Sequence, residues 1–145
     1  MATPLKLVRT AVLDTLILAA SGGTLEGVQA YRIYPFDMDL PRIAMLKTQM
    51  DKVQLSKSSY RYDIRVPLEV MAYRQTERAV MTLDEIEEAV DTLLDNGASG
   101  ADKLTIDGYT VHEQFFEDLD EDEALDSETG ASLDVSTMTL LLVLT

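Results

Sequence analysis

The sequence predicts one α+β domain, in which two helices pack on one face of a mostly antiparallel or mixed sheet of about five strands. Two segments repeat apolar residues at spacings of three and four, as amphipathic helices do. One long segment alternates apolar and polar residues, as a half-buried strand does. Strand-like segments also follow one another without a helix between them, which favours antiparallel pairing. The expected order is α-β-β-β-α-β-β, and the 145 residues fit a single domain.

The first helix is expected to begin at Thr3 and Pro4, since proline favours the first turn of a helix. Apolar residues then recur on one face as far as Ala20. The pair Gly22 and Gly23 is expected to end this helix, because glycine adopts the conformations that stop helical hydrogen bonding.

Two short strands are expected next, at residues 28–34 and 42–48, with residues 35–41 as an irregular connection. Residues 51–59 are mostly polar, and we expect them to form a loop that contains Lys52 and Lys57.

The clearest strand covers residues 59–73, where an apolar residue occupies every second position. Pro67 lacks a backbone donor, so it predicts either an edge position or a bulge. The apolar face of this strand is expected to pack on the apolar faces of the two helices. The residues of this predicted core are Tyr62, Ile64, Val66, Leu68 and Val70 from the strand, with Val8, Val12, Leu16, Ile86, Val90 and Leu93 from the helices.

The second helix is expected at residues 82–94, because Thr82 and Glu85 form a capping-box pattern ahead of an apolar stripe. Its outer face is almost wholly acidic, and Asn96 with Gly97 is expected to end it. Residues 103–116 predict a further strand region, broken near residues 107–108.

An acidic loop is expected at residues 117–130, and a last strand at residues 133–144. Both faces of this last strand are apolar from Leu140 to Leu144, which indicates a central strand or one that a partner covers.

The charge is unevenly distributed along the chain, whose net charge is −14. Residues 1–80 hold 11 basic and 8 acidic side chains, whereas residues 81–145 hold Lys103 against 18 acidic ones. Such acidity disfavours specific binding to DNA, which carries a charge about every 1.7 Å of its axis. The chain has no cysteine, so disulfides and thiolate chemistry are excluded.

No motif for catalysis, a cofactor or a metal is present in the sequence, and the chain is not expected to be an enzyme. His112 is the single histidine, and no nucleophile motif accompanies it, so a hydrogen-bonded surface histidine is expected. The acidic run that begins at Asp118 fails as a calcium-binding EF-hand loop, because the sixth position is Glu123 and the twelfth is Thr129.

The layout resembles that of the tail terminator (tail completion) proteins of long-tailed bacteriophages, of the minor tail protein U type. The features that carry the resemblance are Leu40 and Pro41 before a strand, the long alternating strand, the capped helix, and a final strand that reaches the C-terminus. The resemblance implies a virion tail protein, assembled in the host cytoplasm, that forms a hexameric ring. Its partners would be the tail-tube protein, whose polymerisation it ends, and the connector protein of the head and neck. DNA would pass through the ring without specific binding.

Two groups of residues are candidates for roles in such an assembly. Lys52, Leu55 and Lys57 are candidates for contact with the tail tube or a neighbouring subunit, although an idle surface loop would show the same pattern. Five acids are candidates for the lumen of the ring, with solvent or a neighbouring subunit as alternatives: Asp118, Asp120, Glu121, Asp122 and Glu123. Two other functions stay open, namely a connector or neck protein of the same virion and a small acidic inhibitor that mimics DNA.

Overall fold

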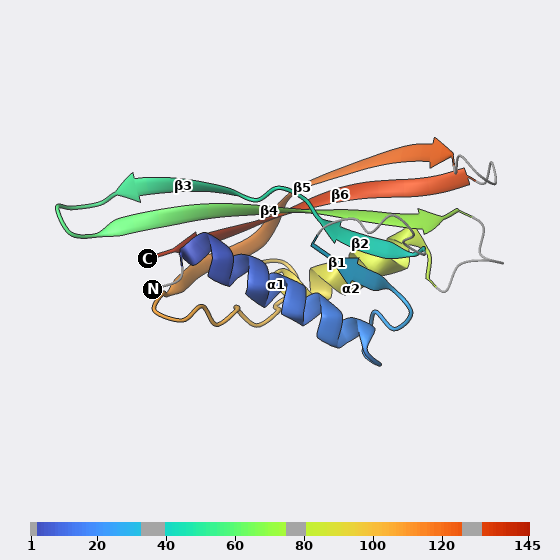
Figure 1. Cartoon of the computed structure of the whole chain (residues 1–145), viewed down its shortest axis with the longest axis horizontal. Coiled ribbons are helices and arrows are strands. Elements are labelled where there is room, and N and C mark those ends of the chain that lie inside the picture. Colours follow the sequence, from blue (N-terminus) through green and yellow to red (C-terminus); the bar gives the residue numbers. More distant parts are fainter. Residues whose placement is uncertain (1–2, 33–39, 75–80, 126–131) are drawn as a thin grey trace.

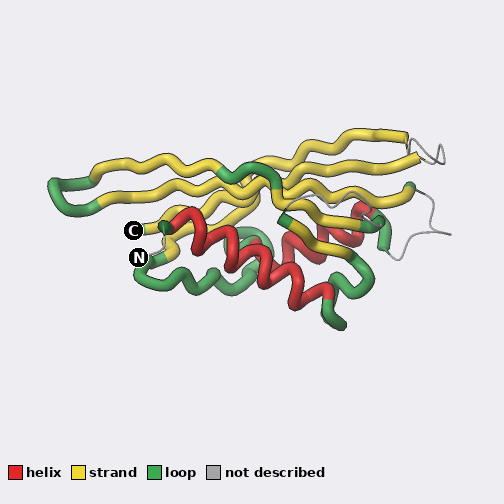
Figure 2. The backbone as a smooth tube through the Cα atoms, viewed as in Figure 1, coloured by secondary structure: helices red, strands yellow, loops and turns green. Residues whose placement is uncertain are grey.

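The computed structural model describes residues 3–32, 40–74, 81–125 and 132–145, and it has the expected α+β fold (Figure 1). The predicted elements occur in the expected order, but the sheet has six strands, one more than the sequence suggested. Both helices lie on the same face of the sheet, as predicted (Figure 2). None of the described helices has the length and apolar character needed to cross a membrane.

Helix α1 (Pro4–Ala20) begins and ends where the sequence predicts. The Thr3 side chain accepts a hydrogen bond from the Lys6 amide, at 3.3 Å. After the last helical residue the chain turns at Gly22, whose φ of 100° is a left-handed conformation that favours glycine. A Cβ atom on Gly23 would lie 2.8 Å from the Ala19 carbonyl oxygen, so the chain turns too closely here for a larger residue.

Helix α2 (Leu83–Leu94) carries the predicted capping box between Thr82 and Glu85, but it ends differently from the prediction. Gly97 is not in a left-handed conformation. The buried carboxylate of Asp95 stops the helix instead, accepting hydrogen bonds from the amides of Ala98 at 2.9 Å and Phe116 at 3.1 Å. Asp95 therefore fastens the end of α2 to a strand of the sheet.

The strands form one mixed sheet in the order β1-β2-β4-β6-β5, with β3 beside the first half of β4. Only β1 and β2 run parallel, and every other pair is antiparallel. The bounds are β1 (Gln29–Tyr31), β2 (Arg42–Met45), β3 (Gln49–Gln54), β4 (Tyr60–Tyr73), β5 (Val111–Leu125) and β6 (Ser132–Leu144). The predicted end of the first strand, at residues 33–34, lies outside the described residues.

Three segments differ from their sequence prediction. Residues 49–54 form strand β3, so the loop predicted at residues 51–59 is limited to residues 55–59. The strand predicted from residue 103 begins only at Val111. The acidic loop predicted at residues 117–130 is wrong as far as residue 125, because strand β5 continues to Leu125. Residues 126–130 lie outside the described residues.

The buried Gln114 explains why residues 103–110 do not pair as a strand. Its side-chain oxygen accepts a hydrogen bond from the Leu104 amide at 2.8 Å, and its nitrogen donates one to the Leu94 carbonyl at 2.8 Å. One side chain on β5 thus satisfies the backbone of the preceding loop and of the end of α2.

The core lies between the helices and the sheet, as predicted. The predicted residues of β4 and the helices are buried in it, apart from Tyr62 and Leu93, which are partly buried at its margin. The two-residue period of β4 therefore gave the correct register, since a slip of one residue would have turned Val66 outwards.

Pro67 lies in an interior strand and not at the edge of the sheet. Its carbonyl accepts a hydrogen bond from the Leu46 amide at 2.9 Å, in the gap between β2, which ends at Met45, and β3. The amide and carbonyl of one strand residue point to the same side, so the missing donor of Pro67 faces this gap. The proline is tolerated because no ladder hydrogen bond is required there.

Candidate functional site

The face of the sheet that lies opposite the helices is a candidate for contact with another molecule. No described helix covers it (Figure 1). Several apolar side chains on it are half-buried, among them those of Pro67, Met71, Phe115, Leu141 and Val143. β6 is a central strand, as its apolar sequence predicted, and its outward residues contribute to this uncovered face.

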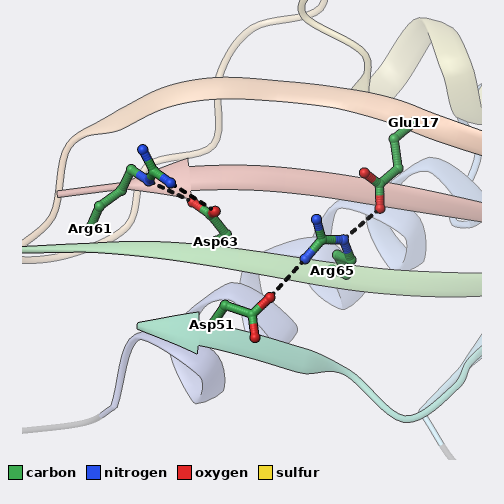
Figure 3. Close-up of polar contacts among 5 residues, drawn as sticks. All are labelled: Asp51, Arg61, Asp63, Arg65 and Glu117. Carbon is green, nitrogen blue, oxygen red and sulfur yellow. Dashed lines mark hydrogen bonds and ion pairs between the residues drawn. The ribbon is translucent and has the colours of Figure 1, made fainter. Parts of the chain in front are cut away.

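A series of ion pairs crosses this uncovered face (Figure 3). Arg65 on β4 bonds Asp51 on β3 at 3.1 Å and Glu117 on β5 at 2.7 Å. The hydrogen bond to Glu117 is the largest of the effects that raise the pKa of the Arg65 guanidinium. Arg61 bonds Asp63 on the same strand, with 3.0 Å between Nε and Oδ1. The ion pairs link three strands, and each remains accessible to a partner.

Strand β5 contains two irregularities that change the direction in which polar side chains point. The pairing with β6 skips His112 and Glu117, so each is an extra residue in the strand. Glu117 consequently reaches over β6 to Arg65, and the Nε2 of His112 lies 2.6 Å from the Thr145 hydroxyl. His112 is therefore a hydrogen-bonded, exposed histidine, as expected.

The hairpin of β3 and β4 extends beyond the part of the sheet that the helices cover (Figure 1). The structure places Lys52 on β3, with its ammonium 4.1 Å from the centre of the Tyr60 ring, a cation–π distance. Leu55 is 55% exposed and Lys57 is exposed in the turn. Leu55 also lines a shallow groove with Arg61, on the uncovered face. The three interface candidates thus lie on one projecting element.

The five lumen candidates do not form one group, because alternate residues of a strand point to opposite faces. Asp118, Asp120 and Asp122 are paired with Thr139, Thr137 and Val135, which belong to the uncovered face. Glu121 and Glu123 point to the helix face, where Glu123 bonds Arg74 at 2.9 Å. All five are exposed.

Arg74 borders an open pocket of about 470 Å³ between the start of α2 and the distal half of β5. It also bonds Asp134 on β6 at 3.0 Å, and the hydrogen bond to Asp134 is the largest of the effects by which these carboxylates raise the pKa of Arg74. Close to this pocket, burial raises the pKa of Glu87 on α2 to about 7, and the charges of Glu121 and Asp84 add to the rise. The Ser136 hydroxyl partly offsets it.

The sequence did not point to the residues around this pocket. Arg74 after β4, Asp84 and Glu87 on α2, and Asp134 on β6 belong to three different segments, which only the folded sheet brings together. The outer face of this helix is predicted to be almost wholly acidic, yet the acidic side chain of Glu87 is half-buried. The only indication in the sequence that Glu87 would be partly buried is its position directly after the apolar Ile86.

No protein-family model and no curated protein matches the sequence. The fold is similar to that of a chain in a solved structure described as the virion of a native gene transfer agent (GTA) particle. The two chains are 12% identical, the TM-score is 0.63, and the similarity covers 95% of each chain. At this identity, the likeness establishes that the two chains share a fold over nearly their whole length.

Proposed function

We propose that this chain is a structural protein of a phage-like virion, and that copies of it form a hexameric ring that caps the tail tube. The ring would end polymerisation of the tube and provide the surface to which the head joins. The observation that carries the proposal is the fold shared with a gene transfer agent virion chain over 95% of both chains. The tail-terminator-like order of elements in the sequence supports the same assignment.

The positions of the charges suit a head-to-tail contact between copies. The hairpin with Lys52 and Lys57 lies at one end of the sheet, and the acids of β5 lie on the opposite edge at the other end (Figure 1). A contact between two different surfaces of the same protein closes into a ring when its rotation allows. Opposite charges on those surfaces set the register and speed the encounter.

The uncovered face of the sheet gives such an assembly further area to bury. It combines half-buried apolar side chains such as Leu141 and Val143 with the ion pairs of Arg65. An apolar patch rimmed by polar residues is typical of protein–protein contact sites. We infer that a neighbouring subunit or the tail tube covers this face in the particle.

The acids on the uncovered side of β5 suit the lumen of the ring. Carboxylates there would repel the phosphates of passing DNA and keep the DNA from binding. Only Asp118, Asp120 and Asp122 remain candidates, since Glu121 and Glu123 face the helix side. Replacing these three by asparagine should slow the passage of DNA in those particles that assemble. A ring structure with the three residues on the outer rim would overturn this assignment.

Deleting the gene tests the proposed function directly. Particles made without this chain should contain overlong tails that lack heads, seen by electron microscopy. Tails of normal length that fail to join heads would instead assign the chain to the connector or neck. A chain that stays monomeric and binds a DNA-binding protein would support the alternative function, an acidic inhibitor that mimics DNA.

A charge-reversal variant then tests the hairpin. Lys52→Glu with Lys57→Glu should abolish tube capping without unfolding the chain, because both side chains are exposed. Lys6→Glu with Lys103→Glu is the matched control, since it makes the same change of charge at exposed positions away from the hairpin. Normal tail length in the first variant would remove the hairpin from the interface.

A further inference from the structure

Three carboxylates from helix α2 and strand β5 lie close together beside the pocket that Arg74 borders. Asp84 and Glu87 lie one turn apart at the start of α2, and Glu121 projects from β5. Carboxylate oxygens of the three residues lie within 4.8 Å of one another. Arg74 bonds Glu123 and Asp134, and among the described residues no lysine or arginine forms an ion pair with the three carboxylates. Three carboxyl groups are therefore held together without a described cation between them.

A buried hydroxyl gives a second, independent indication of a ligand. Ser136 is 0% exposed and stands opposite Glu121 in the β5–β6 pairing, so both side chains leave the sheet on its helix face, toward Glu87. The hydroxyl lies near the Glu87 carboxyl and lowers its pKa, but no hydrogen bond between Ser136 Oγ and Glu87 Oε1 is present. Within the described part of the chain, Ser136 Oγ and Glu87 Oε1 are both buried and lack a hydrogen-bond partner. Buried polar atoms in proteins nearly always have a partner, so a ligand is expected at this point.

We propose that Asp84, Glu87 and Glu121 bind one divalent metal ion of the hard, oxygen-seeking class, with Ca²⁺ as the preferred ion. Calcium–oxygen distances are about 2.3–2.6 Å, so oxygens on opposite sides of the ion lie about 4.6–5.2 Å apart. The three carboxylates meet this spacing as they stand, within 4.8 Å. Mg²⁺ demands near-ideal octahedral geometry at about 2.0–2.1 Å and gives up its water molecules reluctantly, so three side-chain carboxylates favour Ca²⁺, whose coordination is more flexible. The open pocket leaves room for the water molecules that complete the coordination.

The ion would tie the first turn of α2 to the edge strand of the sheet. The site is separate from the hairpin and from the uncovered face, so the inference does not depend on the proposed ring.

Calcium titration of the full chain, freed of metal with a chelator, tests the inference. Isothermal titration with CaCl₂ at about pH 8 should show one saturable site per chain, and CaCl₂ should raise the melting temperature, because an ion that binds only the folded state stabilises it. Glu87→Gln and Glu121→Gln should each weaken binding at least about tenfold, since each removes a charged ligand. MgCl₂ in the same titration should bind more weakly than CaCl₂.

Glu88→Gln is the matched control, since Glu88 is an exposed acid next to Glu87 on the same helix. It should bind Ca²⁺ as the unaltered chain does. Circular dichroism checks that each variant is folded, and the glutamine replacements keep the size of the side chain. Absence of saturable binding in the unaltered chain would overturn the inference. So would an equal loss of affinity in Glu88→Gln, because diffuse attraction to an acidic surface would then account for the binding.

Discussion

Glu87 shows how much the surroundings of a single residue depend on the fold. It lies among acids in the sequence, as though on a solvated helix face, but β5 and β6 cover it in the structure. Burial raises its pKa from 4.5 to about 7, and Glu121 and Asp84 strengthen the effect. In the unfolded chain the same carboxyl is solvated, so the folded state binds a proton more strongly than the unfolded state does.

This difference makes the stability of the chain depend on pH. Because the pKa of Glu87 is higher in the folded state, its unfavourable contribution grows as the pH rises from about 4.5 to about 7. With a chelator present, Glu87→Gln should be more stable than the unaltered chain at about pH 8. The gain should be about 1 kcal/mol, well below the full value of the pKa shift, because the side chain is partly exposed and water screens it.

Urea denaturation at several pH values measures this effect. The difference in free energy of unfolding between Glu87→Gln and the unaltered chain should shrink as the pH falls toward 4.5, the pKa of Glu87 when unfolded. Glu88→Gln should show no comparable dependence on pH. A difference that stays constant across the range would mean that the Glu87 pKa is not raised.

At the scale of the elements, strand β4 organises the fold. Its even-numbered residues meet both helices, and its odd-numbered residues carry the ion pairs of the uncovered face. Val66 lies at its centre and is 0% exposed. The strand pairs with β2 and β3 on one side and with β6 on the other, so a change in its register would affect the whole sheet.

Val66→Asp should therefore unfold the domain. The substitution places a charge without a partner in the core, at a cost of about 4 kcal/mol or more. Val53→Asp provides a matched comparison, because Val53 lies on β3 and is only half-buried. That variant should lose less than about 1 kcal/mol. Thermal denaturation distinguishes the two, and a Val66→Asp chain that melts like the unaltered one would refute the register of β4.

The sequence predicted those elements that bury one face and missed those that bury none. Both helices, β4 and β6 have an apolar stripe, and they were located nearly to the residue. β3 and the distal half of β5 are exposed on both faces, so no apolar alternation marks them. Residues of β5 such as Asp120 therefore look like part of a loop. The proximity of Glu87 to Glu121 could not be predicted from the sequence either, because it depends on the position of the part of β5 that was predicted to be a loop.

At the scale of the whole molecule, the ends of the sheet differ in charge. The lysines of the hairpin and the acids of distal β5 lie at opposite ends (Figure 1). Among the described residues, the cations of the close ion pairs are Arg61, Arg65 and Arg74. Lys52 and Lys57 are not in these pairs, so a carboxylate of another copy could bind them. The proposed ring would thus depend on electrostatic attraction between neighbours.

The ring should consequently be sensitive to salt. Screening shortens from about 10 Å at 0.1 M to about 3 Å at 1 M ionic strength, which weakens contacts between exposed charges. Light scattering should show a sixfold assembly at low ionic strength and smaller species near 1 M. The variant that carries both Lys52→Glu and Lys57→Glu should form only small species at both ionic strengths. An assembly that is unaffected by salt would indicate that apolar contacts hold the copies together.

The irregularity at Glu117 makes β5 tolerant of a change in length at one point. Because Glu117 is the extra residue in the pairing, its deletion would leave Asp118 opposite Thr139 and every later side chain on its present face. Only the ion pair with Arg65 would be lost, at a cost of about 1 kcal/mol or less. Deleting Asp120 would instead turn Glu121 and Glu123 to the opposite face and separate Glu123 from Arg74. A comparison of the two deletions by thermal denaturation would show whether related chains can gain or lose a residue at this position while the two faces of the strand stay intact.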